Sequence, residues 1–268
     1  MNRLIRLTAA LFFLSATALW GQSGQWTHSY YVGTAPQLTV ESNDASISVR
    51  CGGKNNIEAH VYTEGYNINR GDNAVTIRDQ QNGYRLSLNV HIPQSHWGLH
   101  FGNNNHRVRI EVIVPVDTFV SASSGDGAIK LEGLHAGADL RTSDGSVEVT
   151  GHQGSLKAHT SDGSITFDGV FDNLDLHSSD GSIHGTVRPG SHLGSAWHLV
   201  TSDGSIEVGI PGDLAAQLDL NTGDGRVLVD GFPLNGRVER QHVFAPLNGG
   251  GKTLEARSSD GSIHFRRN

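Results

Sequence analysis

Apolar and polar residues alternate along most of this chain, in short runs separated by a recurring turn. Around Thr160-Ser161-Asp162-Gly163-Ser164-Ile165, Leu156 and Ala158 precede the turn and Phe167 follows it, with polar residues at the positions between. A period of two is typical of a β-strand with one buried face and one solvent-exposed face. The pattern therefore predicts two short strands for each copy of the turn.

The turn recurs at a nearly constant interval. Its aspartates fall at positions 126, 144, 162, 180, 203, 224 and 260, so the first three intervals are all 18 residues. The later intervals are 23, 21 and 36 residues, and a degenerate copy occurs earlier as Ser42-Asn43-Asp44-Ala45-Ser46-Ile47. A fixed period of this length indicates stacked repeats. We interpret the intervals of 23 and 21 as lengthened corners. The interval of 36 indicates either a repeat that has lost its Asp-Gly or a protruding loop.

Two architectures fit this repeat. One is a parallel β-solenoid, resembling a β-roll or β-helix, with about 18 residues and two strands per coil; the other is an antiparallel meander with Asp-Gly as the hairpin loop. We favour the solenoid, because stacked coils need identical corners whereas hairpins need only a turn. At each corner we expect glycine to supply a positive φ and the aspartate carboxylate to bond backbone N–H groups. Ala45 then predicts a different corner in the first repeat.

The chain divides into three predicted segments. Residues 1–21 resemble a signal peptide, with two arginines before an apolar run that is shorter than a membrane span. Residues 22–115 are an irregular N-terminal β segment that includes the degenerate repeat, and we expect them to cap the first coil. Residues 116–268 are the regular solenoid repeats. Arg266 and Arg267 are expected on the final edge, where charge discourages end-to-end pairing.

Net charge and cysteine content limit the classes of function that the protein can have. The net charge is −7, and removal of Arg3 and Arg6 with the signal peptide would change it to −9, since residues 1–21 contain no Asp or Glu. Such a balance argues against a nucleic-acid-binding surface, which needs a basic face. Cys51 is the single cysteine, so an internal disulfide is excluded, and we interpret it as a small buried apolar residue.

The recurring aspartates are the first candidate for chemistry. In stacked coils neighbouring carboxylates lie close together and repel, so something must offset the repulsion. We favour a role in forming the turn, with calcium binding as the alternative and catalysis as the least favoured interpretation. A residue that repeats in every unit serves the repeat, whereas a catalytic group is usually singular.

Histidines are the second candidate. Paired imidazoles on one face bind zinc or copper, or titrate together near neutral pH, but we favour the interpretation that they are polar residues on exposed strand faces. The residues concerned are His159 and His177 at equivalent positions of adjacent repeats, and His91, His96, His100 and His106 around the loop of residues 93–107.

Enzyme motifs are missing from the sequence, including Gly-x-Ser-x-Gly, the phosphate-binding Gly-x-x-x-x-Gly-Lys-Ser/Thr and His-Glu-x-x-His. We therefore assign no catalytic, cofactor-binding or metal-binding residue. The outward positions after each turn show no concentration of acids that would mark a glycan-cleaving groove. These positions are Lys130, Glu148, Thr166, His184, Glu207, Leu228 and His264.

The apolar leader, the degenerate repeat ending at Val49, the strand Arg107-Val-Arg-Ile-Glu-Val-Ile-Val-Pro115 and the serial Thr/Ser-Ser-Asp-Gly-Ser-Ile units resemble the bacterial putative-adhesin family. Its members are exported β-strand-repeat proteins of unknown function. The resemblance covers nearly all of the chain after the leader. It implies a parallel β-solenoid on or outside the cell membrane and supplies no catalytic residues.

From these features we expect an exported, non-enzymatic, adhesin-like binding or scaffold module of the cell envelope or surface. Its location would be the periplasm, the cell surface or the extracellular space, with no transmembrane segment in the mature chain. Its partner would be an envelope protein, matrix or a glycan, not a nucleic acid, and no cofactor is expected. The alternatives are a polysaccharide-active β-helix enzyme and a calcium-stiffened β-roll.

Overall fold

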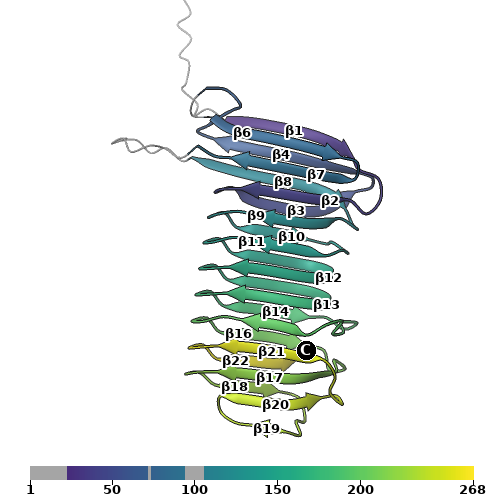
Figure 1. Ribbon diagram of the computed structural model, residues 1–268, viewed down its shortest axis with the longest axis vertical. Coiled ribbons are helices and arrows are strands. Elements are labelled where there is room, and N and C mark those ends of the chain that lie inside the picture. Colours follow the sequence, from purple (N-terminus) through teal and green to yellow (C-terminus); the bar gives the residue numbers. More distant parts are fainter. Residues whose placement is uncertain (1–22, 72–73, 94–105) are drawn as a thin grey trace, which may run out of the picture.

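The protein is a tall stack of β-strands (Figure 1). This computed structural model describes residues 23–71, 74–93 and 106–268, and within them every helix or strand element is a strand. No helix in this part of the chain has the length and apolarity needed to cross a membrane. The predicted all-β, mostly parallel arrangement is confirmed. The predicted signal peptide, residues 1–21, lies outside the described residues, and the boundary between residues 115 and 116 stays a prediction.

The strands that precede each Asp-Gly corner form one ladder, which we call the first ladder. Its neighbours pair in parallel except at the two ends, where β6, β20 and β19 are antiparallel. β5 (Asn67–Ile68) pairs with β6 beside it. In spatial order the first ladder contains β6 (Ala74–Asn82), β7 (Arg85–His91), β2 (Gln37–Ser42), β9 (Phe119–Ser123), β11 (Ala138–Arg141), the second half of β12 (Val147–Thr160), the second half of β13 (Ile165–Ser178), β15 (Trp197–Val200), β21 (Thr253–Ser258), β17 (Ala216–Thr222), β20 (His242–Leu247) and β19 (Arg237–Val238).

The strands that follow each corner form the second ladder. Its pairings are parallel except for β1 and β4, which lie antiparallel at one end. In spatial order it contains β1 (Ser23–Tyr31), β4 (Asn56–Glu64), β8 (Arg107–Pro115), β3 (Ser46–Gly53), β10 (Ile129–Glu132), the first halves of β12 and β13, β14 (Ile183–Val187), β16 (Ile206–Ile210), β22 (Ile263–Arg267) and β18 (Val227–Asp230).

Register follows the sequence period. Val147 pairs with Ile165 and Leu156 pairs with Leu174, so residues 18 apart lie side by side on parallel strands in both ladders. The antiparallel meander considered from the sequence is therefore wrong for these repeats. The inward residues of both ladders join one hydrophobic core, and Leu156, Ile165 and Phe167 are at most 1% exposed. Burial of this apolar surface is the main force that holds the ladders together.

Near the N-terminus, spatial order departs from chain order. The degenerate repeat of β2 and β3 lies between the repeat of β7 and β8 on one side and the repeat of β9 and β10 on the other. The expectation that Ala45 distorts its corner is wrong. Its backbone N–H bonds Ser42 Oγ at 3.2 Å, and its carbonyl accepts from Ser124 Oγ at 2.9 Å, as in the regular repeats.

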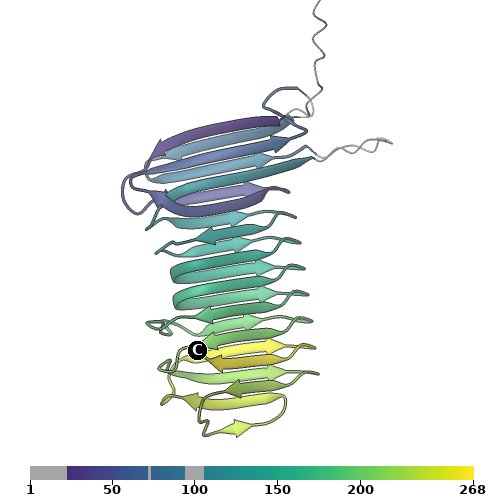
Figure 2. The ribbon, with the colours of Figure 1, turned by 180° about the vertical axis from the view of Figure 1, so that it is seen from behind.

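Near the C-terminus, spatial order again differs from chain order. After β16 the chain skips one position in the stack, forms β17 and β18, turns back through β19 and β20, and then fills the vacant position with β21 and β22. The end of the chain therefore lies inside the stack (Figures 1 and 2). The expectation that Arg266 and Arg267 form the final edge is wrong, because β22 pairs with β16 and β18 on its two sides.

The same arrangement explains the interval of 36 residues between Asp224 and Asp260. Residues 237–247 are neither a lost repeat nor an unpaired loop. They form the antiparallel pair β19–β20, and β20 pairs with β17 from Ala216↔Leu247 to Asn221↔His242. The hairpin thus covers the last parallel strand of the first ladder, whose unpaired edge would otherwise be open to other chains.

Candidate functional site

The hydroxyl at the start of each turn links neighbouring repeats. Thr160 is fully buried, and its Oγ1 donates to the carbonyl of Gly145 at 3.0 Å and accepts from the N–H of Gly163 at 3.1 Å. The same hydroxyl-to-carbonyl bond recurs at every repeat, with lengths of 2.6–3.0 Å. The pairs are Ser124–Ala45, Thr142–Gly127, Thr160–Gly145, Ser178–Gly163, Thr201–Gly181, Ser258–Gly204 and Thr222–Gly261.

Glycine is needed in the turn for a different reason from the one predicted. Gly163 has no positive φ, but a Cβ on it would lie 1.9 Å from the carbonyl oxygen of Gly145. Gly181 and Gly261 face the same obstacle at 2.0 Å. The turn glycines therefore allow close approach of one repeat to the next. In the degenerate repeat, alanine fills the equivalent position as Ala45 and is fully buried.

The aspartates of the turn are exposed, and they form one column along the corner edge of the stack. Their backbone N–H groups are bonded to the neighbouring repeat: the N–H groups of Ser161 and Asp162 both donate to the carbonyl of Ser143, at 2.9 and 3.0 Å. In the described residues, no hydrogen bond joins the carboxylates of the seven Asp-Gly turns to the backbone. The predicted carboxylate–backbone bond is therefore wrong, and the buried Thr or Ser hydroxyl does that work.

A cavity of about 310 Å³ lies at the N-terminal end of this column. Asp44, Tyr66, His106 and Arg107 contribute to its lining, and the rings of Tyr66 and His106 are 4.6 Å apart. Partial burial and the neighbouring Asp126 carboxylate raise the pKa of Asp44. Burial, followed by the nearby Asp44, raises the pKa of the Tyr66 phenol. The cavity offers a carboxyl, a phenol and an imidazole to a small polar molecule.

The predicted histidine pair exists. The rings of His159 and His177 stack at 4.8 Å with an interplanar angle of 2°, on the outer surface of the first ladder. Burial and the adjacent His177 imidazole lower the pKa of His159. His91 and His106 are exposed, whereas His96 and His100 lie outside the described residues. Among the described residues, no three His, Cys, Asp or Glu side chains gather closely enough to hold a metal ion.

His152 was not singled out from the sequence, yet it is fully buried at the opposite corner of the stack. Its Nε2 lies 3.2 Å from the carbonyl of Ser155, and its ring centroid lies 5.9 Å from that of Phe171. Its Nδ1 has no hydrogen-bond partner among the residues that the structure describes. Burial lowers the pKa of His152. The signal that could have identified it is the period of 18 residues, which places His152 at the position of the apolar Leu134 in the preceding repeat.

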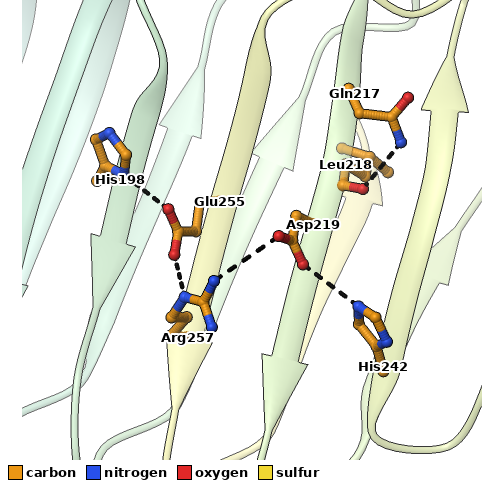
Figure 3. A network of polar contacts seen from close by, with 7 residues as sticks. All are labelled: His198, Gln217, Leu218, Asp219, His242, Glu255 and Arg257. Atoms are coloured by element: carbon orange, nitrogen blue, oxygen red, sulfur yellow. Dashed lines mark hydrogen bonds and ion pairs between the residues drawn. The ribbon is translucent and has the colours of Figure 1, made fainter.

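Along the C-terminal half of the first ladder, charged residues and histidines face outward on successive strands. Figure 3 shows the part of this surface around the inserted strand β21. His198 lies 3.0 Å from Glu255, and Asp219 lies 3.8 Å from Arg257 and 3.3 Å from His242. Glu255 also pairs with Arg257, which is the main cause of the lowered pKa of Glu255. The charges of this half are therefore largely engaged with one another across β15, β21, β17 and β20.

The outward column of the second ladder follows the period of two, one residue per strand from Lys130 to Leu228. Within this column, Lys130 pairs with Glu148 at 3.5 Å. Cys51 is partly buried against the core.

A family model described as Toastrack DUF4097 matches residues 36–266. The chain belongs to this family. The resemblance to the bacterial putative-adhesin family is confirmed at this level. The matched residues include both places where spatial order differs from chain order, at β2 and β3 and at β21 and β22. The toastrack match therefore spans nearly the whole stack. No curated protein matches the chain.

Several solved structures are similar to this toastrack protein. A putative adhesin from Bacteroides fragilis is 13% identical, with a TM-score of 0.43 and coverage of 91% of this chain and 97% of that one. A putative lipid binding protein from Parabacteroides distasonis is 16% identical, with a TM-score of 0.39 and coverage of 91% and 98%. A putative cell adhesion protein from Clostridium sporogenes is 12% identical, with a TM-score of 0.38 and coverage of 91% and 100%.

Proposed function

We propose that this toastrack protein is an exported, non-enzymatic binding or scaffold module of the cell envelope or surface. Its architecture in this proposal is a parallel β-solenoid of two-strand coils, about 18 residues each, with the N-terminal β segment as a cap. Its partner is an envelope protein, matrix or a glycan, and its site of action is the periplasm, the cell surface or the extracellular space.

The observation that carries this proposal is the use made of the recurring polar residues. Thr160 and its equivalents bond the next repeat, and the turn glycines make room for that repeat, so these positions serve the stack. What remains for recognition is the outer surface of the two ladders, which is long, continuous and regularly spaced. Extended surfaces of this kind are what repeat proteins commonly use for binding.

A glycan panel tests the proposal against its main rival, a polysaccharide-active enzyme. Purified protein is incubated with immobilised and soluble acidic and neutral glycans and with cell-envelope extract. We expect retention on at least one of these materials without cleavage. The appearance of new reducing or unsaturated ends would contradict the non-enzymatic proposal, as would a failure to bind any envelope component. Heat-unfolded protein is the control for nonspecific adsorption.

A further inference from the structure

The N-terminal end of the first ladder carries a groove of about 210 Å³ on its outer surface. Two rows of side chains cross β6, β7, β2 and β9 there, in register from strand to strand. One row is Asn82, Arg85, Gln37 and Phe119; the other is Gln80, Ser87, Thr39 and Ser121. Leu86 forms part of the floor.

The polar groups of this surface are available for a ligand. The two rows contain three amides, three hydroxyls and one guanidinium, and no carboxylate. Within residues 23–71, 74–93 and 106–268, the side chains of the two rows make no hydrogen bond or ion pair with the protein. The C-terminal half of the same ladder differs, since its charges pair with one another. In a chain of net charge −7, these two rows carry a single charge, the Arg85 guanidinium.

Two exposed aromatic residues adjoin residues that line the groove: Phe119 pairs with Gln37, and Tyr84 directly precedes Arg85. Phe119 is 42% exposed, and its ring lies over Gly137, where a Cβ would approach the ring to 3.1 Å. Tyr84 is 46% exposed in the turn between β6 and β7, with the Arg85 guanidinium 5.4 Å from its ring centroid. Exposed rings beside amides that are not otherwise bonded combine an apolar platform with groups that both donate and accept hydrogen bonds.

We propose that this groove binds a neutral glycan chain. A sugar ring presents hydroxyl groups at its rim, which pair with amides and hydroxyls, and C–H groups on its faces, which pack on aromatic rings. The in-register spacing of the two rows across four strands, roughly 4.8 Å per strand, suits a chain that runs across the ladder. The carboxylates of an acidic glycan would find a positively charged partner in these two rows only at Arg85. The inference rests on the proposed function and names the ligand class for it.

Calorimetric titration with soluble oligosaccharides tests this inference. The probes are neutral hexasaccharides of β-1,4-linked glucose, β-1,3-linked glucose, α-1,4-linked glucose and β-1,4-linked N-acetylglucosamine, with oligogalacturonate as the acidic comparison. We expect at least one neutral probe to bind more tightly than the acidic one. We expect Gln37→Ala and Phe119→Ala each to weaken that binding by about tenfold.

Matched controls are Gln217→Ala and Phe244→Ala. Gln217 occupies the position of Gln37 in another repeat, and Phe244 is an exposed ring at the far end of the stack. Unchanged affinity in these controls supports the assignment. The inference is overturned if none of the neutral probes binds, or if Gln37→Ala and Phe119→Ala bind as the unaltered protein does. Retention on envelope extract in that case would leave the proposed function standing while removing this groove from it.

Discussion

Thr160 illustrates how single residues of the turn act on the next repeat. Its hydroxyl satisfies a carbonyl of the neighbouring repeat and an N–H of its own, both inside the stack. Gly163, three residues later, lets the two backbones approach. Asp162 lies between them with an exposed side chain. The buried hydroxyl and the glycine are therefore the structural part of the motif, and the carboxylate is not.

The glycine can be tested by Gly163→Ala. The added Cβ would meet the carbonyl of Gly145 at 1.9 Å, so the two repeats must separate. We expect the free energy of unfolding to fall by about 1–3 kcal/mol, the usual cost of overpacking. Urea denaturation measures the change, with Asp162→Asn as the exposed control, expected within about 0.5 kcal/mol of the unaltered protein. Equal stabilities of the two variants would refute the close-approach explanation.

The hydroxyl can be tested by Thr160→Val. Valine keeps the shape but leaves a buried carbonyl and a buried N–H without partners, so we expect a loss of about 1–3 kcal/mol in the free energy of unfolding. Thr160→Ser is the matched control, because serine already fills the equivalent position at Ser178 and forms the same bonds. The explanation fails if Thr160→Val is as stable as Thr160→Ser.

His152 gives the stack a pH dependence. Burial lowers its pKa in the folded state, so below about pH 6.5, the ordinary value for histidine, the unfolded chain takes up a proton that the folded protein does not. We therefore expect the free energy of unfolding to decrease as the pH falls from 7 to 5. His152→Leu, which copies the neighbouring Leu134, should flatten that decrease. Denaturation at both pH values measures it, and an unchanged slope in the variant would rule out this role for His152.

At the residue scale, the sequence predicted which positions face inward, because Leu156 and Ile165 follow the period of two. It did not predict why glycine is required. The atom that a Cβ at Gly163 would meet belongs to Gly145, so the constraint exists only once the stack is known. The period of two likewise did not reveal the buried position of His152, which only comparison with Leu134, 18 residues earlier, would have indicated.

Among the elements, the inserted strands β21 and β22 distinguish this fold from a simple succession of repeats. Val208 and Val229 lie on either side of Phe265, from β16 and β18. Phe265 is fully buried although only three residues follow it. Chain ends usually fray unless they are tied down, and here pairing on both sides ties the end down.

Phe265→Ala tests the insertion. Truncation of a buried phenylalanine costs about 3–5 kcal/mol, and we expect a loss of this size so close to the C-terminus. Arg266→Ala changes the exposed face of the same strand and should alter the free energy of unfolding by no more than about 0.5 kcal/mol. Amide hydrogen exchange adds a second readout, since residues 263–267 should exchange as slowly as those of β13. Rapid exchange there, or equal stability of the two variants, would argue for a frayed end.

The insertion could not be predicted from the sequence. All repeats share the same inward pattern, so Ile263 fits equally well beside Ile206 or Val227, and in the structure it pairs with both. Consecutive elements are usually neighbours in space, and that rule gave the wrong position for β22. The interval of 36 residues signalled an irregularity, but the pairing of β20 with β17 depends on contacts that no local pattern records.

On the scale of the whole molecule, antiparallel strands close both ends of the first ladder, and β22 lies within the stack. The long outer surfaces are therefore the main surfaces that the described residues present to their surroundings. At the N-terminal end of the first ladder, the two rows of the groove carry amides, hydroxyls and the single charge of Arg85. At its C-terminal end, the charged residues pair with one another. The aspartate column runs along one corner of both. Our central claim is that the buried apolar core and the hydrogen bonds between repeats hold the stack, without help from these carboxylates.

The melting temperature of a variant with Asn in place of all seven aspartates, at positions 126, 144, 162, 180, 203, 224 and 260, tests that claim. Stacked like charges repel, so we expect a higher Tm than that of the unaltered protein at low salt, with the difference shrinking as salt screens the charges. We also expect EDTA to leave the Tm of the unaltered protein unchanged. A lower Tm in the variant would contradict the claim, because it would show that the carboxylates stabilise the stack. A Tm of the unaltered protein that falls on addition of EDTA would contradict it too, and would indicate that the carboxylates hold a divalent cation such as calcium.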